Sequence, residues 1–270
     1  MKLFEAVTSK KITGTVLASA LVIASFGTMT AFAAKGSDAI PKNTVMTAPA
    51  LTDTSVTSSD KAQGTIEYGK TTYSRTDGSQ NVTMEHWYNP QTKDFRSDVR
   101  DYSADHQLLS YKSTYFLNGN NVMVVIQRDP NGDPVSGKML KRSDDPKPFE
   151  PSDKKNLGFS GVKNNYKASY WTSVGTEQTP GGKTLNKLMR DSYQSYIDDN
   201  TLANMQYIVY VDQKSGFPVK EELYEDSTGT FKLFSSDTEE YQYVSDDGSI
   251  FNTSGVTLTP VKTSAEVAAK

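Results

Sequence analysis

The side chains that could bind a transition metal are few in this sequence. It contains two histidines, His86 and His106, and no cysteine. Sites for zinc and similar metals are built from clusters of His, Cys and carboxylates. His86 falls in the middle of a segment that reads as a strand, where a packed and hydrogen-bonded histidine is an ordinary core residue. We therefore expect no metal site and no cofactor.

Two short motifs resemble ligand-binding loops in part. Residues 129–133 (DPNGD) place oxygen ligands at alternate positions, as in a calcium loop, but Leu140 stands where that loop carries a bidentate glutamate. Residues 181–184 (GGKT) resemble a phosphate loop, but Glu177 replaces its first glycine. We expect the first motif to form a turn. We expect the second to be a lead-in with Thr184 as the cap of a helix.

The sequence contains no complete set of residues for the active site of a hydrolase. Residues 158–161 (GFSG) lack the spacing of a nucleophile elbow, and the two histidines are the only candidates for its base. Glycoside hydrolysis needs two carboxylates about 5 to 9 Å apart. The pairs Asp98 with Asp101 and Asp144 with Asp145 lie in polar runs, which favours solvated charges. The sequence predicts a protein that is not an enzyme, with a cell-wall hydrolase as the second alternative.

Apolar and aromatic side chains offer a binding surface instead. The chain has 15 Tyr, 11 Phe, 2 Trp and 8 Met, and many of them alternate along expected strands. On the inner face of a curved sheet they form either a packed core or the wall of a cavity for an apolar ligand. The candidates for ligand-binding residues are Trp87, Tyr111, Tyr115, Met123, Val125, Trp171, Leu188, Met189, Tyr207 and Val209.

The strands that would carry these side chains are marked by alternation and by turns. Asp-Gly in the turn 76–79 predicts a hairpin, and the unbroken apolar run 122–126 predicts a strand buried on both faces. On the strand 219–224, Val219, Glu221 and Leu223 should share one face. The expected strands are residues 65–73, 80–88, 95–102, 108–117, 122–126, 205–211, 219–224, 231–234 and 238–244.

The expected cover of this sheet lies between residues 129 and 197. Leu185, Leu188, Met189 and Ser192 have helical spacing, which predicts a helix over residues 185–197. Residues 129–161 contain five prolines and read as a long loop. We expect the helix and the loop to cover the concave face of the sheet.

The C-terminal strands resemble those of the lipoprotein-carrier (LolA-like, RseB-like) fold family. The likeness is carried by "YVDQKSGFPVKEELYEDSTGTFK" and "YQYVSDDGSIFNTSGVTLTPV", at Asp212, Gly216, Pro218, Lys220, Gly229, Phe251 and Gly255. The resemblance implies an α+β, mainly antiparallel fold in which a curved half-barrel sheet is covered by a helix and a long loop. It also implies a non-catalytic role: holding a lipid or acyl chain, escorting a lipoprotein, or regulating a protein partner in the envelope or in spores.

The N-terminus indicates export. Lysines precede the short apolar run 16–26, and Ala31-Phe32-Ala33 provides a cleavage site, so we expect a signal peptide over residues 1–33, cleaved after Ala33. A flexible polar lead-in over 34–63, a domain over 64–262 and a tail over 263–270 should follow.

The overall charge limits the class of partner. The net charge of −3 argues against a nucleic-acid partner, which a basic domain would bind. We expect an exported protein that holds a lipid or a lipoprotein acyl chain in a concave apolar cavity, without a membrane span after cleavage. The alternative is a regulator that binds an envelope protein, in which case an exposed acidic edge would serve as the interface: Glu221, Glu222, Glu225 and Asp226.

Overall fold

The computed structural model describes residues 66–141, 143–144, 158–190, 193–196 and 202–268. The predicted signal peptide and lead-in lie outside these residues, as does the stretch 145–157 of the expected loop. The elements are β1 (Ile66–Arg75), β2 (Asn81–Tyr88), β3 (Phe95–Tyr102), β4 (Leu108–Leu117), β5 (Val122–Arg128), β6 (Pro134–Lys141), α2 (Phe159–Asn165), β7 (Trp171–Gln178), β8 (Thr184–Arg190), β9 (Tyr193–Tyr196), β10 (Leu202–Asp212), β11 (Pro218–Asp226), β12 (Lys232–Val244), β13 (Leu258–Val261) and α3 (Ser264–Ala268).

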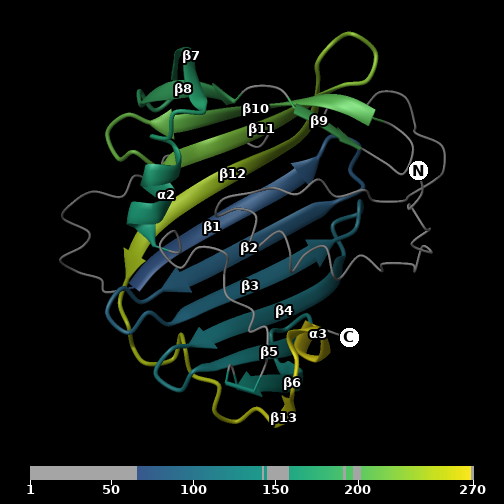
Figure 1. Cartoon of the computed structure of the whole chain (residues 1–270), viewed down its shortest axis with the longest axis vertical. Helices are drawn as coiled ribbons and strands as arrows, with labels where there is room; N and C mark the ends of the chain where they lie inside the picture. The colour runs from purple at the N-terminus through teal and green to yellow at the C-terminus, as the bar shows by residue number, and fades with distance from the viewer. Residues whose placement is uncertain (1–65, 142, 145–157, 191–192, 197–201, 269–270) are drawn as a thin grey trace, which may run out of the picture.

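The strands form one open, curved sheet, which confirms the predicted fold class (Figure 1). Its order is β13-β6-β5-β4-β3-β2-β1-β12-β11-β10-β8-β7, with β9 paired to β10. The pairings are antiparallel except that of β13 with β6, which is parallel. The first strand, β1, therefore lies inside the sheet, and its neighbour β12 comes from the other end of the chain.

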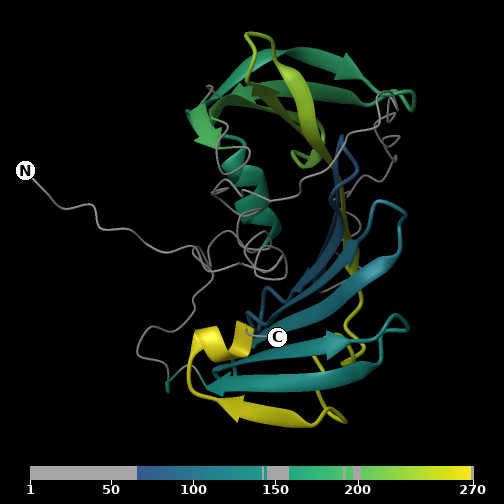
Figure 2. The ribbon, with the colours of Figure 1, turned by 90° about the vertical axis from the view of Figure 1, so that its right-hand side faces the viewer.

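Each strand presents alternate side chains to the two faces of the sheet. On β2, Val82, Met84 and Tyr88 are buried on the same face, as the alternation predicts. That face is concave, because the sheet bends around the side on which α2 and α3 lie (Figure 2). The connection from β12 to β13 crosses the convex face, where Val256 packs against the buried cluster of β4 and β5.

Both helices pack on the concave face. Phe159 of α2 is buried against Phe217 and Tyr241. Val267 of α3 is 1% exposed and packs with Met123 and Leu140. Residues 263–270, expected to be a tail, thus include a packed helix, and the folded unit extends beyond residue 262.

The predicted helix over 185–197 is wrong. Residues 184–190 form β8, which is hydrogen-bonded to β7 on one side and to β10 on the other. Leu185 and Met189 are four residues apart, a spacing that puts two side chains on one face of either a helix or a strand. The GGKT motif is the turn between β7 and β8, so Thr184 caps no helix. Residues 197–201 lie outside the described part of the chain.

The expected loop over 129–161 is wrong in part. Residues 134–141 form β6, which pairs with β5 through the turn at 129–133. That turn is confirmed, since the Asp129 carboxylate accepts the backbone N–H groups of Asn131 and Asp133. Within the residues described, no helix has the length and apolar composition needed to cross a bilayer.

Candidate functional site

The structure places the predicted ligand-binding residues on both faces of the sheet. Met123, Val125, Leu188, Tyr207 and Val209 belong to the concave side. Trp87, Tyr111, Tyr115 and Met189 belong to the convex side. Trp171 lies on the edge strand β7, where its ring contacts Tyr166 and Tyr170. The set therefore does not line a single cavity, and Met123 and Val125 are covered by α3.

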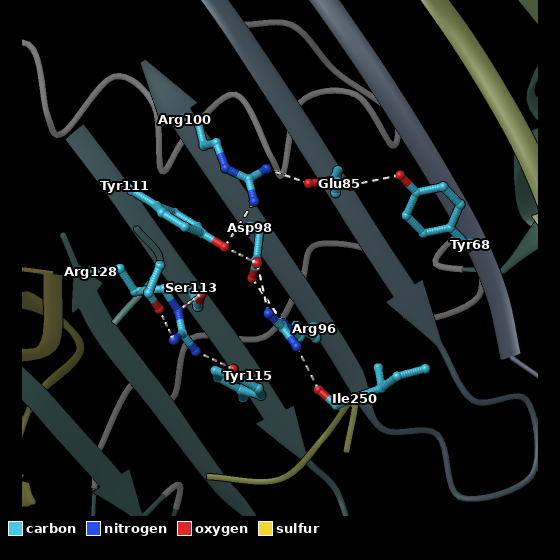
Figure 3. Close-up of polar contacts among 11 residues, drawn as sticks. Tyr68, Glu85, Arg96, Asp98, Arg100, Tyr111, Ser113, Tyr115, Arg128 and Ile250 are labelled. Carbon is cyan, nitrogen blue, oxygen red and sulfur yellow. Dashed lines mark hydrogen bonds and ion pairs between the residues drawn. The ribbon is translucent and has the colours of Figure 1, made fainter. Parts of the chain in front are cut away.

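A chain of charged and aromatic side chains crosses β1 to β5 on the convex face (Figure 3). At its centre Asp98 is 1% exposed and accepts two hydrogen bonds from the Arg96 guanidinium, at 2.9 and 2.7 Å. The Tyr111 hydroxyl donates a third bond to Asp98, at 2.8 Å. Burial alone would lower the pKa of Arg96, but its hydrogen bonds to Asp98 and the charge of that carboxylate raise it. The two side chains thus form an ion pair with two hydrogen bonds.

The chain of contacts continues to either side of Asp98. Arg100 forms an ion pair with Glu85 and donates to the Tyr111 hydroxyl, and Tyr68 donates to Glu85 at 2.7 Å. Arg128 donates to the hydroxyl groups of Ser113 and Tyr115. We call Tyr68, Glu85, Arg96, Asp98, Arg100, Tyr111, Ser113, Tyr115 and Arg128 the convex network.

The convex network is a stabilising element. Its carboxylates form ion pairs with arginines. Two of its rings, those of Tyr111 and Tyr115, lie under guanidinium groups. Asp98 is therefore not a solvated charge, and that prediction is wrong. Asp101 faces the other side of β3 and accepts from Ser110, so Asp98 and Asp101 do not converge as a catalytic pair. Asp145 lies outside the described residues.

The concave face carries an aromatic seat that α2 fills. The Phe159 ring is 4% exposed, and its centroid lies 4.8, 5.7 and 5.0 Å from the ring centroids of Phe217, Tyr241 and Tyr243. Phe217 stacks on Tyr241 at 4.4 Å. We call Phe217, Tyr241 and Tyr243 the aromatic seat.

Two further contacts hold α2 in place. The Phe159 N–H donates to Glu67 at 2.7 Å, which compensates in part for the absence of a side-chain cap. A Cβ atom on Gly158 would lie 2.7 Å from the Glu67 carboxylate and 2.8 Å from Tyr88, so only glycine allows this approach. At the other end of the helix, the Tyr166 hydroxyl donates to Glu221.

Beside the aromatic seat lie three carboxyl groups, Glu221, Asp237 and Glu239, which we call the acid cluster. Glu221 and Asp237 are directly opposite each other on β11 and β12, and Glu239 follows Asp237 on the same face. The Glu239 carboxyl donates a hydrogen bond to Glu221, and the Tyr241 hydroxyl donates to Glu239. Burial, and then the charge of Glu221, raises the pKa values of Asp237 and Glu239 well above their ordinary range. Burial also raises the pKa of Glu221. The cluster thus holds protons that solvated carboxyl groups would lose.

His86 lies on the same face, close to the aromatic seat. Its ring is 6.4 Å from that of Tyr241 and lies over Gly69, where a Cβ atom would come within 2.2 Å of Nε2. Burial lowers the pKa of His86 to about 4. On the concave face, burial thus lowers the pKa of an imidazole and raises the pKa values of the carboxyl groups.

The predicted acidic edge does not exist as an exposed patch. Glu222 is buried on the convex side, where it accepts hydrogen bonds from Tyr210 and Tyr224 and pairs with Lys220. Glu221 points to the concave face. Asp226 accepts the backbone N–H groups of the following turn. For β11, the predicted alternation of side chains between the two faces is confirmed, whereas the exposed acidic edge is not.

Sequence reasoning missed α2 and the acid cluster. The helix has seven residues, which include Gly161 and two asparagines, so it shows no helical period. The alternation of Asp237, Glu239, Tyr241 and Tyr243 along β12 was a usable signal, because it puts acids and rings on one face. Glu221 joins them only through the register of β11 against β12.

Searches against known proteins give similarities of fold only. No family model and no curated protein matches the sequence. Among solved structures, the fold is similar to MucB in a complex with MucA(peri), with a TM-score of 0.36, 12% identity and coverage of 73% of this chain. This chain spans 57% of the MucB chain.

Two other solved structures are similar to a comparable extent. An uncharacterized conserved protein from Thermus thermophilus has a TM-score of 0.33 and 9% identity, covering 75% of this chain and 94% of that one. A beta-barrel-like protein from Brucella abortus has a TM-score of 0.25 and 10% identity, covering 67% and 98%. Likeness of this extent says nothing about activity or partners, and membership of the lipoprotein-carrier family remains a prediction.

Proposed function

We propose that this chain is an exported, non-catalytic binding protein that holds an acyl chain or another lipid tail on its concave face. The observation that carries the proposal is the aromatic seat occupied by Phe159. An apolar side chain from a short helix already fills this part of the sheet, and rings that enclose one apolar group are suited to another. Export rests on the signal peptide expected over residues 1–33.

The attachment of α2 favours exchange with a ligand. A helix of seven residues is marginal by itself in water, so α2 depends on Phe159, on Glu67 and on Tyr166 for its position. An acyl chain that enters the aromatic seat replaces the Phe159 ring with a similar apolar surface, and α2 moves aside.

The acid cluster supports a non-catalytic role. Two carboxyl groups that share a hydrogen bond are closer than the separation of about 5 Å or more that glycoside hydrolysis needs. Tyr166, which follows α2 directly, also donates a hydrogen bond to Glu221. A polysaccharide would have to displace the helix before reaching a pair with unsuitable geometry.

Lipid extraction with native mass spectrometry of the secreted protein tests the proposal. We expect an acyl species near one per chain, and we expect uptake of a fluorescent fatty acid such as cis-parinaric acid. Phe159→Ala empties the aromatic seat and should strengthen that uptake. Phe231→Ala, at a ring that is 38% exposed, is the matched control and should leave it unchanged. A lipid-free mass together with no uptake by either protein would overturn the proposal.

The edge strand β7 favours a second candidate, a regulator that binds a protein partner. Residues 172–178 are exposed along the whole strand, and β7 is the last strand on its side of the sheet. An exposed edge can pair with an extended segment of another protein. Val174→Lys, at a side chain that is 44% exposed, should abolish capture of such a partner from envelope extract. Leu109→Lys, on β4, is the control and should not.

A further inference from the structure

The last described segment of the chain wraps around one edge of the sheet. After β12, residues 245–257 cross the convex face and lead to β13, which pairs with β6 (Figure 2). The chain then turns onto the concave face, where α3 lies. We call residues 258–268 the C-terminal arm and residues 245–257 the link. Because β13 is the outermost strand beside β6, the C-terminal arm can leave without breaking any pairing between the other strands.

The edge of β6 is shaped to receive the strand of the C-terminal arm. β13 adds to β6 in parallel, from the pair of Leu258 with Gly137 to the pair of Val261 with Leu140. A Cβ atom on Gly137 would lie 2.5 Å from Leu258 Cδ2. The glycine therefore leaves a recess for the leucine, as glycine in a strand does where another segment approaches closely.

α3 docks the other end of the C-terminal arm. Val267 is 1% exposed and packs among apolar side chains of β5 and β6. Lys138 of β6 donates to the backbone carbonyl of Glu266 at 3.1 Å. The helix brings its own cap, since the Thr263 hydroxyl accepts the Glu266 N–H and the Glu266 carboxylate accepts the Lys262 N–H. The docking contacts are therefore the same whichever copy of the chain supplies the arm.

The link that keeps the C-terminal arm on its own sheet has little slack. β12 and β13 are seven places apart in the strand order, a span of about 34 Å at about 4.8 Å between neighbouring strands. A flexible chain as long as the link has a root-mean-square end-to-end distance of only about 20 Å. The link also bends at Gly248 and Gly255, which have positive φ, and is tied to Arg96 through the Ile250 carbonyl. A stretched link lowers the effective concentration of the arm at its own site, and strained hinges favour exchange between chains.

We infer that the C-terminal arm is exchanged between two copies of this chain, so that each arm occupies the site on the other copy's sheet. A second copy is the occupant because its arm carries the side chains that the recess and the apolar pocket accept, Leu258 and Val267. Such domain swapping needs no new contact, so its extent depends on protein concentration and on the link. The inference does not rest on acyl binding, since this site is separate from the aromatic seat.

Cross-linking between two single-cysteine variants tests the exchange, because the chain has no cysteine of its own. Lys138 and Thr259 are partners in the pairing of β6 with β13. Lys138→Cys and Thr259→Cys, made in separate chains and refolded together at high protein concentration, should be joined by a short bis-maleimide. Thr72→Cys and Thr238→Cys, at partners in the pairing of β1 with β12 inside the sheet, are the matched control. Treated in the same way, the control chains should not be joined.

Lengthening the link should weaken the dimer. Eight Gly and Ser residues inserted between Ser254 and Gly255 should raise the effective concentration of the arm at its own site about twofold. The dimer Kd, measured by analytical ultracentrifugation, should then rise about fivefold, because both arms are affected. The same insertion between Gly119 and Asn120, in the exposed turn from β4 to β5, is the control and should leave the Kd unchanged.

Three outcomes of these experiments would overturn the inference. They are no cross-link between the Lys138→Cys and Thr259→Cys chains, an equal yield from the control pair, and an equal change of Kd with both insertions. A chain that stays monomeric but binds a labelled peptide of residues 256–268 would also overturn it, and would indicate an extended segment of another protein as the occupant. Uptake of the fluorescent fatty acid should be the same with either insertion, which separates this result from the acyl-binding test.

Discussion

Buried carboxyl groups are stabilised by different partners on the two faces of the sheet. On the convex face, the buried carboxylate of Asp98 is held by Arg96, and Glu85 is held by Arg100. On the concave face, Glu221 and Glu239 are held by tyrosine hydroxyls and by a proton that they share. In the first arrangement, the partners of the carboxylates are arginines of the neighbouring positions on the sheet. The second arrangement depends on a bound proton, and proton binding changes with pH. The concave face is therefore the side of the molecule that responds to pH.

Removal of the Asp98 carboxylate should have the largest effect on stability. Asp98→Ala leaves the guanidinium of Arg96 and the Tyr111 hydroxyl without their acceptor inside the sheet. Breaking a buried ion pair by deleting one partner costs about 3 to 5 kcal/mol. Urea unfolding should show this loss, whereas Asp105→Ala in an exposed turn should not. A loss below about 1 kcal/mol, typical of exposed pairs, would mean that the convex network is not a buried paired element.

Truncation of Phe159 should have the next largest effect. Phe159→Ala leaves a void among the rings of the aromatic seat, and such truncations cost about 3 kcal/mol or more in well-packed sites. We expect faster amide hydrogen exchange in α2 and a lower free energy of unfolding. Phe231→Ala should change neither, because that ring is partly exposed. Unchanged exchange in α2 would show that the helix does not depend on the aromatic seat.

Acid should destabilise the protein through His86. Its pKa is about 4 when folded and about 6.5 when unfolded, so the unfolded chain binds an extra proton between these values. Stability is then fully present above pH 6.5 and falls as the pH decreases, by about 2 kcal/mol at pH 5. His86→Gln should remove this part of the pH profile, and His106→Gln in an exposed turn should retain it. If both variants keep the same acid profile, another group is responsible.

Base should destabilise the protein through the acid cluster, by a smaller amount. The pKa values of Asp237 and Glu239 are raised in the folded state, so unfolding releases protons above about pH 4.5. Stability therefore decreases as the pH rises through the raised values. Glu239→Gln keeps a donor toward Glu221 and removes one ionisation, which should add about 1 kcal/mol at pH 8 and nothing near pH 4.

Chemical unfolding across this pH range measures the difference between the two proteins. Glu240→Gln, on the convex side of the same strand, should follow the original profile. A Glu239→Gln variant that is less stable at pH 8 than the original chain would contradict the shared proton.

The strands could be predicted from the sequence because their signals are local. Alternation on β2 and β11 placed the correct side chains on each face, and the Asp-Gly turn fixed the first hairpin. The helix over 185–197 failed because the spacing of four residues between Leu185 and Met189 fits one face of β8 as well as one face of a helix. This segment is a strand because it pairs with β7 and β10, and that pairing depends on the arrangement of the whole sheet.

The candidate site was harder to predict because its members meet only through strand register. Glu221 and Asp237 face each other across β11 and β12, and a shift of one residue would place them on opposite faces. Asp98 was expected in solvent because its acidic neighbours suggested a polar run. Its burial follows from Arg96 two residues earlier, on the same side of β3, a spacing that the sequence does contain.

The central position of β1 has a consequence for the order of folding. β1 pairs with β2 through a short hairpin, but Ile66 also pairs with Val244, nearly the whole length of the domain away. Contacts between neighbours form early, and those that close long loops form late. We expect β1 to β6 to assemble first as a meander and β12 to join as the last large step. Because β12 carries Asp237, Glu239 and Tyr241, a chain that ends before β12 lacks the concave site, which can form only when nearly the whole polypeptide is available.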